Sequence, residues 1–381
     1  MTSERRVLLD LIRTYSAFLV VLTHATEFVI PAKNLRENLF HPIWLLHLGS
    51  AAVIAFFFLS GFLVGGGVIE KFVNDTLEWK GYLFDRITRL WIVLIPAFPL
   101  IIALNLINCR SEELSRYCSA VWPMLERNAG LPLATQGFQN LIQNMLFTQY
   151  LKSEIFGRNV PLWSLSFEFW YYIGFFGLLY LARNLRRKIF KIGFWGSLIS
   201  LIILSRVVNE TWMKLGTIWL FGAIMSRLLI VADRKRIYLR SQHLVVNKQL
   251  RFILASTFYF VSLLLIRQNP GPFRSTLILV PALSLILASS SPREELISGR
   301  KTVRLISVCA SFSFSLYILH FPIIALLANH FIIHTYETVI LFQLISILGL
   351  VLISVAASYL FAFGTELQLQ VVRKYFRTYF D

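Results

Sequence analysis

Long apolar runs separated by short basic segments make up most of this chain. The runs Leu90–Cys109 and Thr338–Thr365 contain no Asp, Glu, Lys or Arg, and each reaches the roughly 18 to 20 residues that a helix needs to cross a bilayer. The pattern continues along the sequence and predicts an all-α polytopic membrane protein with about ten transmembrane helices. The expected spans are 7–28, 47–69, 88–108, 160–182, 189–206, 212–232, 249–266, 275–291, 304–328 and 338–362.

Lys and Arg residues gather in alternate segments between these spans. The segments on the side of the two chain ends hold 25 of the 37 Lys and Arg residues, the opposite segments hold 11, and Arg13 lies within the first span. Because cytoplasmic segments are enriched in Lys and Arg, we expect both termini to be cytoplasmic. This distribution also accounts for the net charge of +17, so the basic composition favours membrane topology over nucleic-acid binding.

The composition excludes a water-soluble fold. Hydrophobic residues make up 56% of the chain and charged residues 15%, and the mean hydropathy is +0.65, whereas ordinary soluble domains are about 25% charged. Three cysteines without a CxxC spacing support neither a disulfide scaffold nor a zinc site. Cys109 and Cys118 share a predicted outer loop and can pair, although free thiols are favoured. No repeat, linker or appended soluble domain is visible, so residues 1–381 are expected to form one membrane-embedded domain.

The predicted outer loop from about 109 to 159 contains a short amphipathic segment. Its apolar residues recur with helical spacing, so they share one face of a helix. Such a face predicts an interfacial helix that lies on the membrane. The residues of this face are Phe138, Leu141, Ile142, Met145 and Leu146.

Ionisable residues inside the first predicted span need an explanation, because charge within a bilayer is costly. Arg13 and His24 are eleven residues apart, which places them about 20° apart around a helix axis and roughly 16 Å apart along it. Asp10 lies one turn before Arg13 and can pair with it. Either these residues line one functional face, or Asp10 and Arg13 form a structural pair and His24 is a packing residue.

Two later spans carry polar side chains at a comparable depth. Glu168 follows the aromatic segment that begins at Trp163, about two turns below the expected outer surface, and a buried carboxylate needs a partner, a proton or a role. His320 lies in the ninth span, nearly as far from its inner end as His24 lies in the first. The two histidines are therefore expected to face one polar cavity, with a satisfied core histidine as the alternative for His320.

Basic and small residues mark the inner ends of two other spans. Arg86 and Arg89 share one helical face at the start of the third span. Two guanidinium groups on one face can bind phosphate oxygens. The enrichment of arginine in cytoplasmic segments explains the two residues equally well. Gly61 and Gly65 lie one turn apart in the second span, a spacing that favours close helix packing, with backbone approach to a ligand as the second meaning.

Taken together, these segments resemble the acyltransferase-3 family of membrane acyltransferases over nearly the whole chain. Each segment is weakly specific alone, and their shared order makes the resemblance specific. Many members of the family carry a fuller arginine cluster before the third helix, whereas Asp85 precedes Arg86 here. The segments that carry the resemblance, in the family's order, are Arg13 with His24, Phe57–Phe62, Arg86–Leu90, Trp163–Glu168 and Tyr317–Pro322.

The resemblance implies an enzyme that moves an acyl group, most often acetyl, from cytoplasmic acyl-CoA to a hydroxyl of a cell-surface or exported carbohydrate. The expected partners are acyl-CoA, with acetyl-CoA favoured, a carbohydrate or glycolipid acceptor, and the lipid of a bacterial inner membrane. Arg86, Arg89 and Arg13 would guide the donor. No metal is expected, because a thioester already has a good leaving group.

Within this family-based hypothesis, His24 is the general base on the acceptor hydroxyl, since an imidazole takes and returns a proton near neutral pH. Asp10 would orient Arg13, and Glu168 would orient His24 or the sugar. Candidates for binding the sugar are Trp163, Ser166, Tyr317 and His320. The main alternative is a transporter or flippase for a glycolipid or small anion, which also needs charged groups at depth. A non-catalytic sensor or assembly subunit is a third hypothesis.

Overall fold

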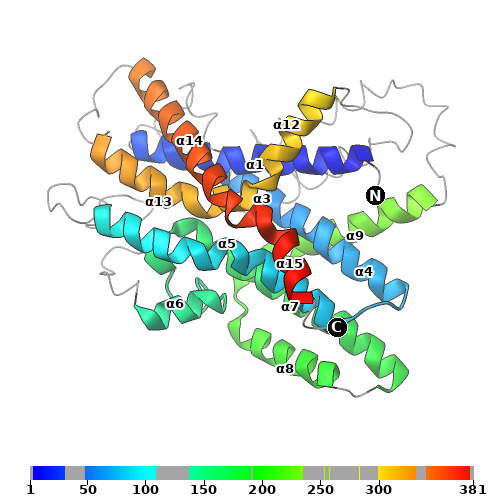
Figure 1. Cartoon of the computed structure of the whole chain (residues 1–381). Helices are drawn as coiled ribbons and strands as arrows, with labels where there is room; N and C mark the ends of the chain where they lie inside the picture. The colour runs from blue at the N-terminus through cyan, green and yellow to red at the C-terminus, as the bar shows by residue number, and fades with distance from the viewer. Residues whose placement is uncertain are drawn as a thin grey trace. The chain divides into compact units, whose positions relative to one another are not determined.

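The computed structural model describes residues 3–30, 48–108, 137–189, 192–234, 299–331 and 340–377, with three isolated positions besides. Helices form nearly all of this part, and its one β pairing is an isolated bridge between Gln149 and Ser153. Figure 1 shows the helices along the chain. They are α1 (Ser3–Val29), α3 (Gly49–Ser60), α4 (Gly66–Val73), α5 (Trp79–Asn108), α6 (Phe138–Met145), α7 (Trp163–Arg187), α8 (Ile192–Val207), α9 (Glu210–Arg234), α12 (Arg300–Ser311), α13 (Ser313–Phe331), α14 (Ile340–Phe363) and α15 (Leu369–Arg377).

Seven helical segments of the described part are long and apolar enough to cross a bilayer. The prediction of an all-α, multi-pass membrane protein is therefore confirmed. The expected spans 249–266 and 275–291 lie outside the described residues, as do Cys109 and Cys118. The count of ten spans and the cytoplasmic side of the termini stay predictions. The seven segments are Arg5–Val29, Gly49–Val73, Trp79–Asn108, Val160–Arg187, Glu210–Asp233, Ser313–Phe331 and Ile340–Arg377.

Two expected spans differ from the structure. The span 189–206 corresponds to α8, which has 16 residues and is a shorter apolar helix than a crossing requires. The span 304–328 is divided at Phe312 into α12 and α13. Basic residues fill the first turns of α12, including Arg300 and Arg304, so the apolar helix starts only at Ser313. The predicted start of the ninth span was wrong for this reason.

The chain divides into two compact units. Unit 1 consists of Met1–Ser16, Ser50–Leu83 and Phe167–Ala310, and unit 2 of Ala17–Gly49, Phe84–Ser166 and Ser311–Asp381. Helices α3, α4, α8 and α9 belong to unit 1, and α6, α13, α14 and α15 to unit 2. Helices α1, α5 and α7 contribute residues to both. That residues 1–381 form one functional domain stays a prediction.

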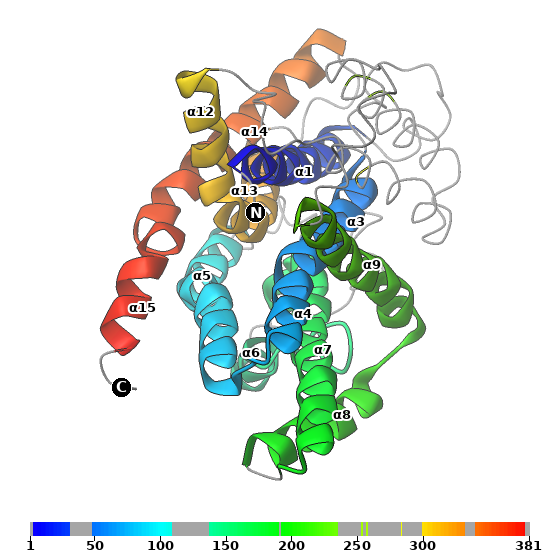
Figure 2. The ribbon, with the colours of Figure 1, turned by 90° about the vertical axis from the view of Figure 1, so that its right-hand side faces the viewer.

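Close helix packing defines unit 1, where α4 lies against α9 (Figure 2). A π-helical turn, Gly61–Gly65, joins α3 to α4. A Cβ added at Gly61 would lie 1.8 Å from the backbone oxygen of Trp219, and one at Gly65 would lie 2.6 Å from the Cβ of Ala223. Side chains larger than glycine therefore have no room at these contacts, and the close-packing prediction for both glycines is confirmed.

Arginines of unit 1 are held by carboxylates near the helix ends. Arg5 is almost fully buried and donates to Asp233 at 2.7 Å. Arg183 donates through Nε to Asp75 at 2.7 Å. The positive-inside rule explains such arginines by their cytoplasmic location alone. The structure shows that they also form ion pairs between helix ends.

Helix α6 of unit 2 turns its polar side towards the protein. Asn140 and Asn144 are buried, whereas Phe138, Ile142 and Leu146 are exposed. The predicted amphipathic helix is therefore present. Its exposed apolar side suits the membrane interface, and its position on a membrane stays a prediction.

The buried Asn144 side chain organises the segment that leads from α6 to α7. Its Nδ2 donates to the backbone oxygens of Asn140 and Glu154, each at 2.9 Å, and its Oδ1 accepts from the backbone nitrogen of Phe156 at 3.0 Å. Irregular backbone beside membrane helices needs such partners, because lipid offers none. Asn144 thereby fixes the approach of the chain to the start of α7.

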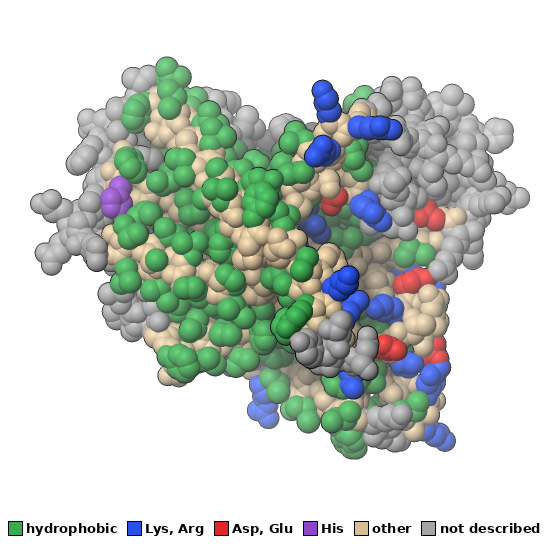
Figure 3. Space-filling model, viewed as in Figure 1, with side chains coloured by type: hydrophobic (Ala, Val, Ile, Leu, Met, Phe, Trp, Pro, Cys, Tyr) green, Lys and Arg blue, Asp and Glu red, His purple; other side chains and the backbone are tan. Residues whose placement is uncertain are grey.

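Helix α14 packs on α13 within unit 2 and exposes its other side. Figure 3 shows hydrophobic side chains covering this exposed side. An apolar helix side of this length is typical of contact with lipid. Its exposed residues include Leu341, Ile345, Leu348, Leu352 and Leu360.

Candidate active site

Two histidines that are far apart in the sequence meet in unit 2. His24 of α1 and His320 of α13 stack, with ring centroids 5.3 Å apart and an angle of 25° between the ring planes. The ring of Phe321 packs edge-on against His24 at 5.2 Å. The structure thus brings together two residues that the sequence placed at one depth.

Glu27 fixes one ring nitrogen of His24. The distance from His24 Nδ1 to Glu27 Oε2 is 3.0 Å, and the two residues lie one turn apart on α1. An ionised carboxylate only accepts hydrogen bonds, so Nδ1 carries the proton and Nε2 of the neutral ring presents a lone pair. Their side chains are 12% and 15% exposed, which leaves the pair partly open to a substrate. A carboxylate that holds an imidazole in this tautomer prepares it to act as a base.

His320 is fully buried and is oriented by the backbone. Its Nδ1 lies 2.9 Å from the carbonyl oxygen of Leu316, which can only accept, so Nδ1 is the donor. Its Nε2 has no hydrogen-bond partner among the described residues. Buried polar atoms are nearly always satisfied, so this nitrogen marks a place for a water molecule or a substrate group.

Hydroxyl and aromatic side chains lie beside the histidines. Tyr317 donates to the carbonyl oxygen of Pro161 at 3.1 Å, and its hydroxyl lies 2.7 Å from that of Ser164. Its ring lies 6.1 Å from His320. These contacts connect the start of α7, where Trp163 lies, to α13. Tyr317 and Ser164 thus provide two neighbouring hydroxyls, and hydroxyls are groups that can form hydrogen bonds with a sugar.

Ser166, a further candidate for sugar binding, is used within its own helix. It is buried, and its hydroxyl donates to the carbonyl oxygen of Trp163 at 2.8 Å. This bond satisfies the donor of the hydroxyl, so Ser166 supports the first turn of α7, and its part in sugar binding stays a prediction.

Glu168 belongs to unit 1, where it ends a chain of hydrogen bonds. Trp219 Nε1 donates to Ser60 Oγ at 3.1 Å, and Ser60 donates to the Tyr172 hydroxyl at 3.1 Å. Tyr172 in turn donates to the Glu168 carboxylate. Every donor in this chain points towards Glu168, which suits an ionised carboxylate.

The expected pair of Asp10 and Arg13 is present, with 4.0 Å between Arg13 NH1 and Asp10 Oδ1. Both residues lie on the part of α1 that belongs to unit 1. Helix α1 runs without a break from Ser3 to Val29. Arg13 and His24 therefore keep the helical spacing that the sequence predicted.

Arg89, one of the two expected phosphate ligands, is held by a buried carboxylate. Its NH2 donates to Glu366 Oε1 at 2.8 Å, and the side chain of Glu366 is 1% exposed. The other oxygen of Glu366 accepts from the nitrogen and the hydroxyl of Ser315, at 2.8 and 3.0 Å. Arg86 lies one turn before Arg89 on α5 and is half-buried. The position of Arg89 is thus fixed by α13 and by the turn after α14.

Sequence reasoning passed over Glu27 and Glu366. Glu27 lies inside the expected first span, one turn after His24, so the spacing of carboxylate and imidazole was an available signal. Glu366 pairs with Arg89 over 277 positions and with Ser315 over 51. No local pattern indicates contacts of that range.

The apolar helices define a multi-pass integral membrane protein, and one of these helices holds an imidazole in contact with a carboxylate. The chain belongs to the acyltransferase-3 family, because the family described as an acyltransferase domain matches residues 6–362. It is therefore an acyltransferase, and the predicted family and enzyme class are confirmed. No curated protein and no solved structure gave a match.

Proposed function

We propose that this acyltransferase moves an acyl group, acetyl in the first place, from cytoplasmic acyl-CoA to a hydroxyl of a cell-surface or exported carbohydrate, and that it works in a bacterial inner membrane. Family membership supports acyl transfer. The observation that carries the proposal is His24, held by Glu27 and stacked on His320. Transfer to a hydroxyl needs a base beside the attacking oxygen, and the pair of Glu27 and His24 supplies one.

In the proposed step, Nε2 of His24 takes the hydroxyl proton while the oxygen attacks the carbonyl carbon of the thioester. The carbon–sulfur bond breaks, coenzyme A leaves as a thiolate, and the proton on His24 passes to that sulfur. Glu27 stabilises the transient imidazolium through its charge. The products are an ester and free coenzyme A, so atoms and protons balance.

On the acceptor side, the unpartnered Nε2 of His320 accepts a hydrogen bond from a second hydroxyl of the carbohydrate. Tyr317 and Ser164 line the same region, and Trp163 offers an aromatic face for the sugar ring. This arrangement makes His320 a positioning residue, because its Nδ1 is held by the backbone.

On the donor side, Arg86 and Arg89 bind the phosphates of coenzyme A. Arg13, oriented by Asp10 in unit 1, is a separate candidate for guiding the donor. Glu27 takes the orienting role first expected of Glu168, because Glu27 contacts the ring. Glu168 remains a candidate for orienting the sugar.

The test is an assay of the purified full chain in nanodiscs with acetyl-CoA and a carbohydrate acceptor. The expected product is an ester that mild alkali removes, formed with one free coenzyme A per ester. Replacing His24 by Ala should lower the rate by about 10² to 10⁴ while donor binding survives. A His24→Ala enzyme that keeps half of the wild-type rate would remove His24 from the mechanism.

His330→Ala is a matched control for His320→Ala. His330 lies on the same helix, and its Nδ1 makes the same kind of contact, 2.9 Å to the carbonyl oxygen of Leu326, but the residue is exposed. We expect His330→Ala to retain the wild-type rate. His320→Ala should raise the acceptor concentration needed for half-maximal rate. Equal behaviour of the two variants would exclude His320 from acceptor binding.

A further inference from the structure

Helix α15 follows the residues that match the acyltransferase family, which end at 362. Its arginines Arg373 and Arg377 lie four positions apart and so share one helical face. Val371 and Tyr375 lie on the other side and are 63% and 60% exposed. The cationic face therefore points to the protein and the apolar face points away from it, as suits a helix at a membrane surface.

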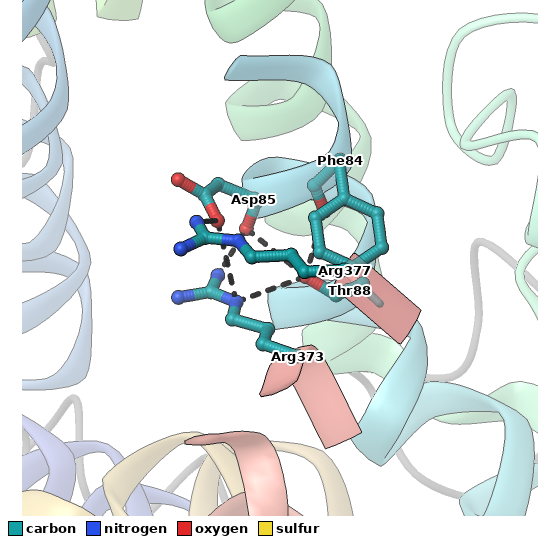
Figure 4. Close-up of polar contacts among 5 residues, drawn as sticks. All are labelled: Phe84, Asp85, Thr88, Arg373 and Arg377. Carbon is teal, nitrogen blue, oxygen red and sulfur yellow. Dashed lines mark hydrogen bonds and ion pairs between the residues drawn. The ribbon is translucent and has the colours of Figure 1, made fainter. Parts of the chain in front are cut away.

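The cationic face of α15 docks on the start of α5 (Figure 4). Arg377 NH2 lies 3.0 Å from Asp85 Oδ1, and Arg373 Nε lies 3.6 Å from the same oxygen. Arg373 also donates to the Thr88 hydroxyl at 3.1 Å and to the backbone oxygen of Asp85. One carboxylate thus faces two guanidinium groups.

These contacts join α15 to the expected donor site. Arg373 bonds to Asp85 and Thr88, which are the chain neighbours of Arg86 and Arg89. Arg89 is paired with Glu366, whereas Arg373 and Arg377 share the single carboxylate of Asp85. Two guanidinium groups on one carboxylate leave an excess of positive charge there, which a bound anion would relieve.

We propose that Arg373 and Arg377 complete a phosphate-binding site with Arg86 and Arg89, and that Asp85 is the counter-ion that the phosphate displaces. Guanidinium forks match phosphate oxygens in geometry and charge.

The ligand chemistry is a phosphate ester, and two molecules can present it at a membrane surface. One is the donor, whose 3′-phosphate and diphosphate would bind here, and this source rests on the proposed function. The other is an anionic lipid headgroup. The two sources differ in whether the ligand is soluble or part of the bilayer, so separate measurements distinguish them.

The first measurement uses the full chain in nanodiscs of phosphatidylcholine alone, with coenzyme A and dephospho-coenzyme A as titrants. We expect Arg373→Gln with Arg377→Gln to weaken coenzyme A binding about 10- to 100-fold, since each lost charge-assisted bond is worth about a factor of ten. The preference for coenzyme A over its dephospho form should disappear. The control is Arg300→Gln with Lys301→Gln, which removes the same charge from exposed positions of α12 and should bind as the wild type does.

A second pair of variants separates ligand binding from docking of α15. Asp85→Asn should tighten coenzyme A binding several-fold, because the phosphate no longer competes with a carboxylate. Arg373→Lys with Arg377→Lys keeps the charge, should fold normally and should bind more tightly than the Gln variants. Weaker binding in Asp85→Asn would show that the ion pairs merely dock α15, which overturns the proposal.

The lipid source is measured by the rise in unfolding temperature when phosphatidylglycerol is added to the nanodiscs. If the Gln variants bind coenzyme A normally but lose this rise, the phosphate belongs to a lipid and the site stands. If both measurements match the wild type, the site is refuted. A wild-type chain that does not bind coenzyme A at all would refute the proposed donor, and the lipid measurement would still test the site.

Discussion

Replacing Glu27 by Gln removes the charge that faces His24 while keeping nearly the same side-chain shape. Glu27 Oε2 lies 3.0 Å from His24 Nδ1, so the substitution changes a charge-assisted hydrogen bond into a neutral one. An amide can also donate through its nitrogen, which would favour the wrong tautomer of the ring. The expected result is a lower rate of acyl transfer with nearly unchanged donor affinity.

The size of the effect follows from the geometry of the pair. A hydrogen bond to a charged group contributes about 1.5 to 3 kcal/mol, and each 1.36 kcal/mol is a factor of ten in rate. The side chains of His24 and Glu27 are 12% and 15% exposed, so solvent screens part of this energy. We therefore expect kcat to fall about 10- to 30-fold in Glu27→Gln, less than the fall of about 10² to 10⁴ on loss of the base itself.

The assay is a double-mutant cycle on the rate of coenzyme A release in nanodiscs. If Glu27 acts only through His24, the variant His24→Ala with Glu27→Gln should be no slower than His24→Ala alone. Glu210→Gln is the control, because Glu210 is an exposed carboxylate whose ion-pair partner is Lys214. Additive losses in the cycle, or a Glu27→Gln enzyme as fast as the wild type, would refute the orienting role.

Four other outcomes are expected. Asn144→Ala should lower the free energy of unfolding by about 1 to 3 kcal/mol, since the buried backbone nitrogen of Phe156 loses its hydrogen-bond partner, and thermal unfolding in nanodiscs would measure this. Gly61→Ala should reduce the yield of folded protein, because its Cβ would meet the backbone of Trp219, whereas Gly67→Ala should not, since nothing lies within 4 Å of its Cβ. Arg86→Gln should raise the donor concentration needed more than it lowers the maximal rate; unchanged donor dependence would contradict a phosphate role. Reporter fusions should place 183–191 in the cytoplasm, and labelling of a cysteine there from the outside would contradict the topology.

Hydropathy located the membrane helices of the described part because crossing a bilayer imposes a length and a composition on each helix by itself. It failed at the start of α13, where part of α12, which begins with basic residues, was joined across Phe312 to the apolar helix as one span. The periodicity of α6 was also readable from the sequence. Which of its sides would be buried was decided by the bonds of Asn144 to the following loop.

The candidate site was partly determined by the sequence. Arg13 and His24 share a helix, so their spacing was fixed by helical geometry alone. That His320 lies at a depth similar to that of His24 could be estimated from its distance to the inner end of its own span. The resemblance of the chain to its family was carried by short motifs that follow the family's order. The sequence thereby determined the family and the enzyme class, while the role of His24 stays a prediction.

Only the tertiary structure decided which groups surround those residues. The stacking of His24 on His320, the pair of Arg89 with Glu366, and the docking of Arg373 on Asp85 join residues that are hundreds of positions apart. Such contacts depend on how helices pack, and a helical pattern records spacing along one helix but not its neighbours. For that reason the two arginines that share Asp85, and with them the proposed phosphate site, emerged from the fold rather than from the sequence.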